Sequence, residues 1–202
     1  MKPTEFAVTT LIFAAAVVLT AVLATATLRA AGGGEQLAPP PAPAGLNKQQ
    51  VRGKYLVDIM GCHDCHTPMK MGPKGPEWDL DRALGGHPES MPMPPAPALQ
   101  MPWAAAMGAT MTAFSGAWGT SFTKNLTPDK ETGLGDWTVE EFITTMKTGK
   151  ERGKGRPVLP PMPVQNLAQL TDEDIRAVFA YLQSLKPIKN RVPQPIDPPD
   201  SK

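Results

Sequence analysis

Apolar residues recur at the spacing of an amphipathic helix in three separate parts of the chain, which we expect to pack together as the helices of one core. These parts cover residues 47–60, residues 139–148, and the stretch between Thr171 and Pro187. Their apolar positions are Val51, Tyr55, Leu56 and Ile59 in the first, Phe142, Ile143 and Met146 in the second, and Ile175, Val178, Phe179, Leu182 and Leu185 in the third.

Helix-terminating signals mark the ends of these stretches. The first ends at Gly61, and the second begins with a capping box formed by Thr138 and Glu141 and ends at Gly149. The third begins with Thr171-Asp-Glu-Asp174, which is a capping box with aspartate in place of the usual glutamate, and Pro187 stops it.

A longer apolar run lies near the N-terminus, where residues 6–28 carry no charge. As a helix at about 1.5 Å per residue, this run is long enough to cross a membrane. We expect a retained transmembrane anchor over residues 1–30. The alternative is a secretory signal cleaved near Ala24-Thr25-Ala26. A linker rich in glycine, proline and alanine follows at 31–46 and leads into the folded domain.

Composition changes this picture in two ways. The chain of 202 residues has 24 prolines, which favour short helices and irregular connections over extended sheets. Its net charge of +1 excludes a globally basic nucleic-acid binder, so we expect no nucleic-acid partner. We place the main domain at 47–190, with a long insertion at about 67–124, and a proline-rich tail at 191–202.

The only two cysteines, Cys62 and Cys65, lie in the sequence Cys62-His63-Asp64-Cys65-His66. This C-x-x-C-H pattern attaches a c-type haem covalently, because two thiols on one helical turn reach the two vinyl groups and the next histidine lies under the iron. We therefore predict one covalent haem c, with His66 as an axial iron ligand. A redox dithiol or half of a zinc site remains open as an alternative.

The second axial ligand has to be chosen among several candidates. Of eleven methionines, Met162 stands out because it lies in the stiff loop Leu159-Pro-Pro-Met-Pro163, just before the last helix. A rigid loop holds a weak thioether ligand in place without a large entropy cost. We predict Met162 as the ligand, and His87 is its main competitor.

The order of these features resembles a class I monohaem cytochrome c of the membrane-anchored bacterial type. The resemblance implies an all-α domain around one haem, with Gly53 of the first helix against Val178 and Tyr181 of the last. It also implies that Asn125 and Thr127, in Asn125-Leu-Thr-Pro-Asp129, reach the haem propionates. The methionine-rich insertion is expected to pack over the haem edge or against a partner subunit, with Cu(I) binding as the alternative.

These features together predict an electron-transfer protein or subunit rather than an enzyme. We expect it to pass single electrons between respiratory or photosynthetic partners, such as subunits of a membrane respiratory complex or a terminal oxidase. The expected location is the bacterial inner membrane, with one membrane span and the haem domain in the periplasm. The alternatives are a haem enzyme, such as a small peroxidase or a sulfur-compound oxidoreductase, and a copper-handling or gas-sensing module.

A basic segment precedes the Met162 loop, with five positive charges between Lys147 and Arg156 and one negative charge at Glu151. Two interpretations remain open for this segment. It forms either a cationic rim that attracts an acidic partner or a solvated loop that its charges keep soluble.

Overall fold

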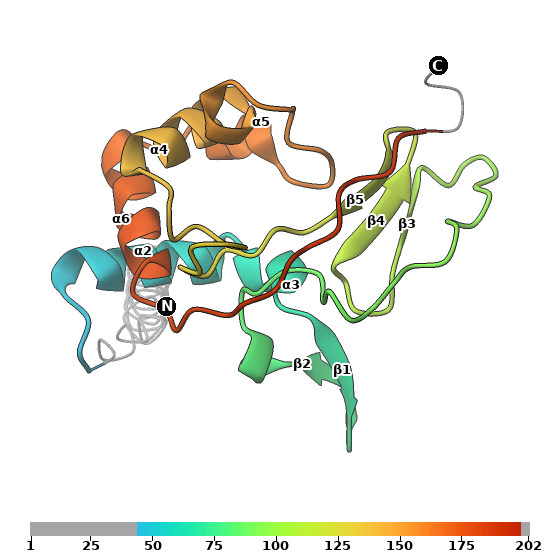
Figure 1. The fold of residues 1–202 in the computed structure, drawn as a ribbon, viewed down its shortest axis with the longest axis horizontal. Coiled ribbons are helices and arrows are strands. Elements are labelled where there is room, and N and C mark those ends of the chain that lie inside the picture. The colour runs from blue at the N-terminus through green and yellow to red at the C-terminus, as the bar shows by residue number, and fades with distance from the viewer. Residues whose placement is uncertain (1–43, 199–202) are drawn as a thin grey trace, which may run out of the picture. The chain divides into compact units, whose positions relative to one another are not determined.

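The computed structural model describes residues 44–198, and short helices surround one side of this domain while small antiparallel sheets form the other (Figure 1). The α-helices are α2 (Lys48–Ile59), α3 (Cys62–His66), α4 (Val139–Thr148), α5 (Val164–Leu167) and α6 (Asp172–Leu182). The strands are β1 (Met69–Gly72), β2 (Gly75–Trp78), β3 (Ala105–Met107), β4 (Ala113–Gly116) and β5 (Gly119–Phe122). Two single 3-10 turns, η1 (Leu80–Arg82) and η2 (Glu151–Gly153), complete the elements.

The three predicted helices are confirmed as α2, α4 and α6. The predicted capping box of Thr138 and Glu141 starts α4, and Gly149, with a φ of 66°, ends it. At α6 only half of the predicted box is present: the Thr171 side chain accepts from the backbone N–H of Asp174, whose carboxylate pairs instead with Arg52 at 2.9 Å. This helix ends at Leu182, earlier than the proline suggested.

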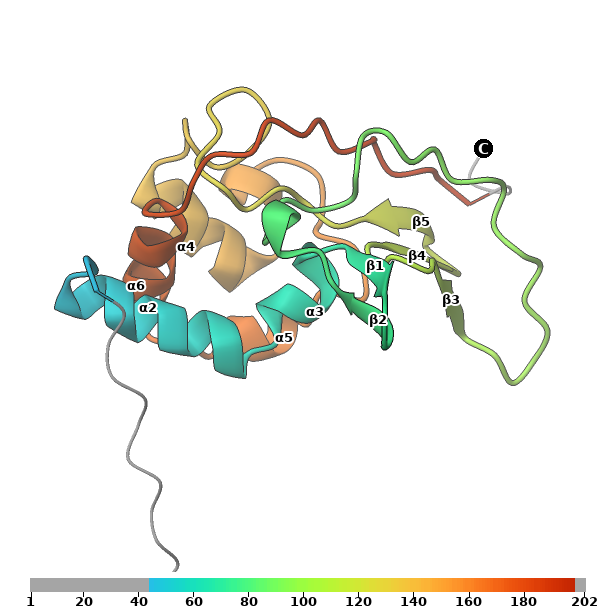
Figure 2. The same cartoon turned by 90° about the horizontal axis from the view of Figure 1, so that it is seen from below.

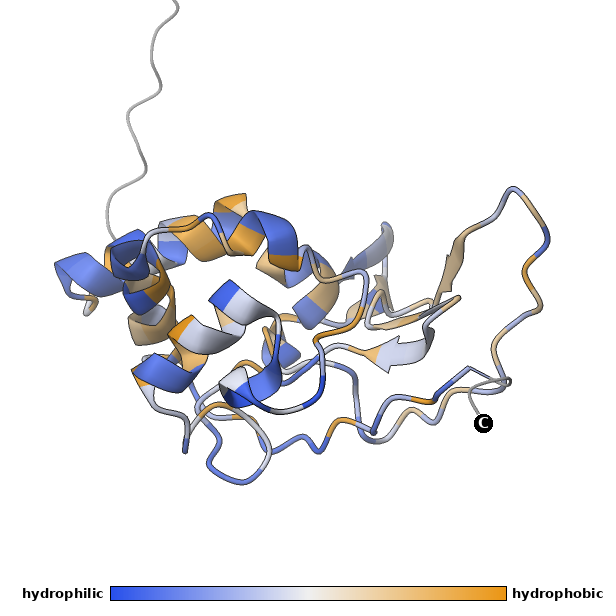
Figure 3. Ribbon diagram, turned by 90° about the horizontal axis from the view of Figure 1, so that it is seen from above, coloured by the Kyte–Doolittle hydropathy of each residue, from blue (hydrophilic) through white to orange (hydrophobic). Residues whose placement is uncertain are grey.

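Helices α2 and α6 cross at Gly53, and this crossing anchors the core. Gly53 is buried, and a Cβ atom there would collide with the backbone carbonyl of Ala177 and lie 2.8 Å from Tyr181 Cβ. The expected contact with Tyr181 is confirmed, while Ala177 takes the place predicted for Val178. The core around this crossing is made of Leu56, Val57, Leu84, Leu134, Phe142, Ile143, Ile175, Val178, Tyr181 and Leu182. In Figure 3 the helices carry hydrophobic and hydrophilic patches in alternation, as amphipathic helices do.

The predicted all-α class needs correction, because the insertion forms two small sheets. Strands β1 and β2 make a hairpin in which Met69 faces Trp78, and β3, β4 and β5 make a second antiparallel sheet in that order. Each strand has only three or four residues, and prolines interrupt the connection between the sheets. Such short strands carry too little alternation to be recognised from the sequence.

The last described residues run as an extended strap along the domain (Figure 2). Asn190 holds the strap in place: it donates to the carbonyls of Gly85 and His87 and accepts from the N–H of Glu89. Further along, Ile196 and Thr120 exchange two backbone hydrogen bonds of 2.8 and 2.9 Å. The strap thereby ties the middle of the insertion, at residues 85–89, and its last strand, β5, to the C-terminal part of the chain.

The predicted single-pass location in the bacterial inner membrane is corrected by the structure. Within residues 44–198, no helix is long and apolar enough to cross a membrane, so the single-pass anchor is not supported. The apolar run at 6–28 and most of the predicted linker lie outside the described residues.

Candidate functional site

The turn that carries the two cysteines starts directly after α2. Gly61 adopts the left-handed conformation, with a φ of 66°, which ends α2 and lets the chain enter α3 at a new angle. All of Cys62-His-Asp-Cys-His66 lies on this short helix. The motif therefore presents both thiols and the final histidine from a single turn held by the core.

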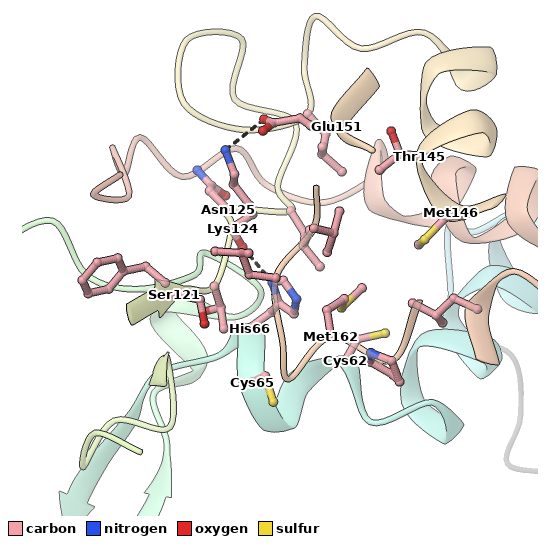
Figure 4. Close-up of a pocket in the computed structure, with 18 of the residues that line it drawn as sticks. Cys62, Cys65, His66, Ser121, Lys124, Asn125, Thr145, Met146, Glu151 and Met162 are labelled. Carbon is pink, nitrogen blue, oxygen red and sulfur yellow. Dashed lines mark hydrogen bonds and ion pairs between the residues drawn. The ribbon is translucent and has the colours of Figure 1, made fainter. Parts of the chain in front are cut away.

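A cavity of about 460 Å³ opens beside this turn, and Cys62, Cys65, His66 and Met162 all lie on its wall (Figure 4). Hydrophobic side chains from four parts of the chain supply much of the remaining wall: Val57, Leu134, Phe142, Val178 and Leu182. The structure thus brings together all four residues that the sequence predicted for the site, and an apolar wall surrounds them.

His66 is buried and oriented by one hydrogen bond. Its Nδ1–H donates to the backbone carbonyl of Lys124 at 2.8 Å, so Nε2 carries the free lone pair. Burial lowers the pKa of His66, and the Lys124 carbonyl opposes that shift only in part. The ring is therefore held neutral, in the tautomer that can bind a metal through Nε2.

The loop that carries Met162 is fixed by a contact that the sequence did not reveal. The Ser121 hydroxyl, at the end of the β4–β5 sheet, donates to the carbonyl of Pro160 at 2.6 Å. The Met162 N–H also donates to the Leu159 carbonyl at 3.3 Å. Backbone hydrogen bonds and flanking prolines thus hold the thioether at the cavity wall.

The pKa values of the two thiols and the lack of nearby metal ligands bear on the two alternatives for the motif, a redox dithiol and half of a zinc site. Burial raises the pKa of the Cys62 thiol to about 11 and also raises the pKa of Cys65. Redox-active C-x-x-C pairs need a lowered pKa, because the thiolate is the reactive form. Within residues 44–198, no group of three or more His, Cys, Asp or Glu side chains is placed to hold a metal ion, as a zinc site requires.

Two further features of the cavity wall fit a haem. The Thr123 hydroxyl, on the wall, is buried without a hydrogen-bond partner among residues 44–198, so it is available to a polar group of a bound ligand. Lys124 and Arg156 also line the cavity and share the carboxylate of Glu151, at 2.9 and 3.4 Å. Their positive charges suit the two propionates of a haem.

His87, the competing ligand candidate, lies away from the cavity wall. Its ring is fully buried, with Nδ1 2.9 Å from the Thr112 hydroxyl and Nε2 2.9 Å from the Met91 carbonyl. Both ring nitrogens are therefore engaged in hydrogen bonds that hold the insertion together.

The expected propionate contacts of Asn125 and Thr127 stay a prediction: Asn125 lies on the cavity wall, but both side chains already have hydrogen-bond partners within the domain. The Asn125 side chain donates to the Ile188 carbonyl at 2.7 Å and accepts from both the N–H and the hydroxyl of Thr127. The Thr127 hydroxyl in turn accepts from the Ile188 N–H. These two side chains use their hydrogen bonds to fasten the C-terminal strap, and Thr123, which the sequence did not single out, is the unsatisfied group at the cavity.

Three of the five cations in the basic segment form ion pairs within the domain. Arg152 pairs with Asp136 at 2.8 Å and with Glu141 at 3.1 Å, and its guanidinium lies 4.8 Å from the ring centre of Trp137. Lys147 pairs with Asp172 at 3.5 Å and Arg156 with Glu151 at 3.4 Å, whereas Lys150 and Lys154 have no ion-pair partner among residues 44–198. Pairing reduces the positive charge of the segment, and the two remaining cations are compatible with either a cationic rim or a solvated loop.

A fold of crossed helices with a C-x-x-C-H turn on an apolar cavity is that of a c-type haem domain. The chain belongs to the cytochrome c family, whose model matches residues 50–186. Membership implies a covalently bound haem c and a role in electron transfer, and the class I resemblance seen in the sequence is confirmed.

The curated relatives are mostly cytochrome subunits of dehydrogenases. The cytochrome c subunit of the quinone-dependent alcohol dehydrogenase of Gluconobacter oxydans (strain 621H) is 40% identical over 145 residues, which are 70% of this chain and 23% of the relative. The fructose dehydrogenase cytochrome subunit of Gluconobacter japonicus is 28% identical over 150 residues, 73% of this chain and 24% of the relative. The chain thus spans about a quarter of the length of the curated relatives it matches. Their names agree with an electron-transfer subunit rather than an enzyme and do not mention a terminal oxidase.

Proposed function

We propose that residues 47–190 form a domain that carries one haem c and passes single electrons within a dehydrogenase complex. In this proposal Cys62 and Cys65 form the two thioether bonds, and His66 and Met162 are the axial ligands of the iron. The proposal is carried by one observation: His66 and Met162, 96 positions apart in the sequence, lie on the wall of the same apolar cavity.

The residues of the cavity account for electron transfer without substrate chemistry. A neutral imidazole together with a thioether favours ferrous iron and gives a higher potential than two imidazoles. With both axial positions filled by the protein, electrons are exchanged without a bond being made or broken to a substrate. We infer that the donor is a dehydrogenase subunit, because the relatives include cytochrome subunits of alcohol and fructose dehydrogenases.

Covalent attachment is tested by extraction of the pigment with acidified acetone. We expect the haem to stay with the protein, and the Cys62→Ala/Cys65→Ala double variant to lose it to the solvent. The Asp64→Asn variant is the matched control. Asp64 lies between the two cysteines, but its side chain is exposed and forms no thioether bond to the haem. Extraction of the haem from the unchanged protein would contradict this part of the proposal.

The role in a dehydrogenase complex is tested with the native assembly, isolated in mild detergent through a tag on this chain. We expect a dehydrogenase subunit to co-purify, and the haem absorption to change to that of the reduced form when ethanol or fructose is added. Reduction by neither of these, with no dehydrogenase subunit present, would contradict the proposed partner while leaving the haem assignment intact.

A further inference from the structure

An exposed tryptophan stacks directly on the turn that carries the cysteines. Trp78 is the last residue of β2, its side chain is 44% exposed, and its ring centre lies 5.6 Å from that of His63. The two rings are tilted by 36°, within the range of attractive aromatic pairs. His63 lies between Cys62 and Cys65, so Trp78 extends this turn of the haem site to the protein surface.

Both partners of this stack are held in place. The Thr67 hydroxyl accepts from the Leu84 N–H at 2.9 Å, which leaves its own proton for His63 Nδ1 at 2.8 Å. The hairpin is closed at its base, where the Asp79 N–H donates to the Pro68 carbonyl at 2.8 Å. Trp78 therefore presents a rigid aromatic surface whose position does not depend on the binding of a partner.

We infer that Trp78 is the contact through which electrons pass between the haem and a protein redox partner. This inference rests on the proposed function, because it takes Cys62 and Cys65 as the attachment points. With a haem c held by Cys62 and Cys65, one electron would leave the iron and reduce the partner, with no bond made or broken and Trp78 chemically unchanged. Its ring shortens the distance that the electron crosses between the cysteine turn and the partner. The rate of electron transfer falls steeply as that distance increases.

The charges near Trp78 identify the kind of partner. Asp64, Glu77 and Asp81 have no ion-pair partner among residues 44–198, whereas Lys74 is the unpaired cation of the same hairpin region. The nearby Lys70 and Arg82 are both taken up by Asp79. The excess of acidic side chains in this region therefore favours a partner with an apolar contact surface bordered by basic side chains.

The test uses the haem-loaded protein and tris(phenanthroline)cobalt(III), an aromatic cation that shares the chemistry of such a partner. We expect Trp78→Ser to slow oxidation of the reduced protein about tenfold, the scale on which aromatic contact residues act at interfaces. Trp78→Phe is expected to retain most of the rate. Trp103→Ser is the matched control: Trp103 is 72% exposed but lies just before β3, outside the β1–β2 hairpin, and its loss is expected to leave the rate unchanged.

A second measurement detects contact between Trp78 and a probe that cannot accept an electron. The redox-inert, paramagnetic tris(phenanthroline)chromium(III) is expected to broaden the indole N–H signal of Trp78 more than those of the other three tryptophans, Trp103, Trp118 and Trp137. Equal rates in the Trp78 and Trp103 variants, or stronger broadening at Trp103, would overturn the inference. An unchanged absorption spectrum in the variants shows an intact haem site, whereas failure of the proposed function removes the haem spectrum whatever residue occupies position 78.

Discussion

Replacing Met162 with alanine is expected to abolish the methionine-to-iron charge-transfer band of the oxidised protein and to lower its midpoint potential. A thioether stabilises ferrous iron relative to the water or hydroxide that would replace it. The expected decrease is on the order of 100 mV, a fraction of the about 0.8 V over which axial ligands set haem potentials. Absorption spectroscopy and a potentiometric titration of the purified protein measure both effects.

Met146 provides the matched control for this experiment, because it is a second methionine on the wall of the same cavity (Figure 4). Met146→Ala is expected to keep the band and most of the potential. His87→Asn should reduce stability, since the His87 ring joins Thr112 to Met91, but it should keep the band. Loss of the band in either control, with the band retained in Met162→Ala, would show that the ligand assignment is wrong.

Replacing Gly53 with alanine is expected to destabilise the domain by about 2–4 kcal/mol, as overpacking of a close contact does. In an ordinary helix interior the same change stabilises by about 1 kcal/mol, so the sign is opposite to that expected from helix propensity. The reason is the crossing: the new methyl group would occupy the space of the Ala177 carbonyl oxygen, and backbone cannot rotate away as a side chain can.

Gly108→Ala is the control for this change, because it adds the same methyl group at a place where the neighbour can move. The added Cβ would lie 3.0 Å from Met93 Cε, which is the end of a flexible side chain. We expect a change within about 0.5 kcal/mol. Urea unfolding followed by circular dichroism compares the two variants, and equal stabilities would contradict the assigned role of the crossing.

The helices were predictable because their signals are local. Thr138 and Glu141 are three residues apart and satisfy each other's backbone groups in the first turn of α4, so the sequence alone determines where that helix begins. The spacing of Cys62, Cys65 and His66 is also local, since all three lie on one short helix. Met162 was singled out as a candidate for a similar reason, because its neighbouring prolines stiffen the loop whatever the rest of the chain does.

The contacts that complete the site were not predictable, because each joins parts of the chain that are far apart. The carbonyl that orients His66 belongs to Lys124, 58 residues away, and every residue carries such a carbonyl. The Ser121 hydroxyl reaches Pro160 over 39 residues, and nothing in the adjacent sequence distinguishes it from other serines. Such pairs are set by the way the insertion folds back on the helices.

The net charge of the basic segment and the short strands were not decided by the sequence. The basic residues near Arg152 form a cationic run in the sequence, but the fold places Asp136 and Glu141 in ion pairs with Arg152. The hairpin of β1 and β2 has too few residues for a periodic hydrophobic pattern. It becomes evident only from the pairing of the two strands, in which Met69 lies opposite Trp78. The sequence by itself therefore determined the helices and the covalent motif, whose interactions span a few residues. Only the tertiary structure decided the hydrogen bonds that orient His66 and the Met162 loop, the ion pairs near the cavity and the position of Trp78. These depend on groups that meet only after the chain has folded.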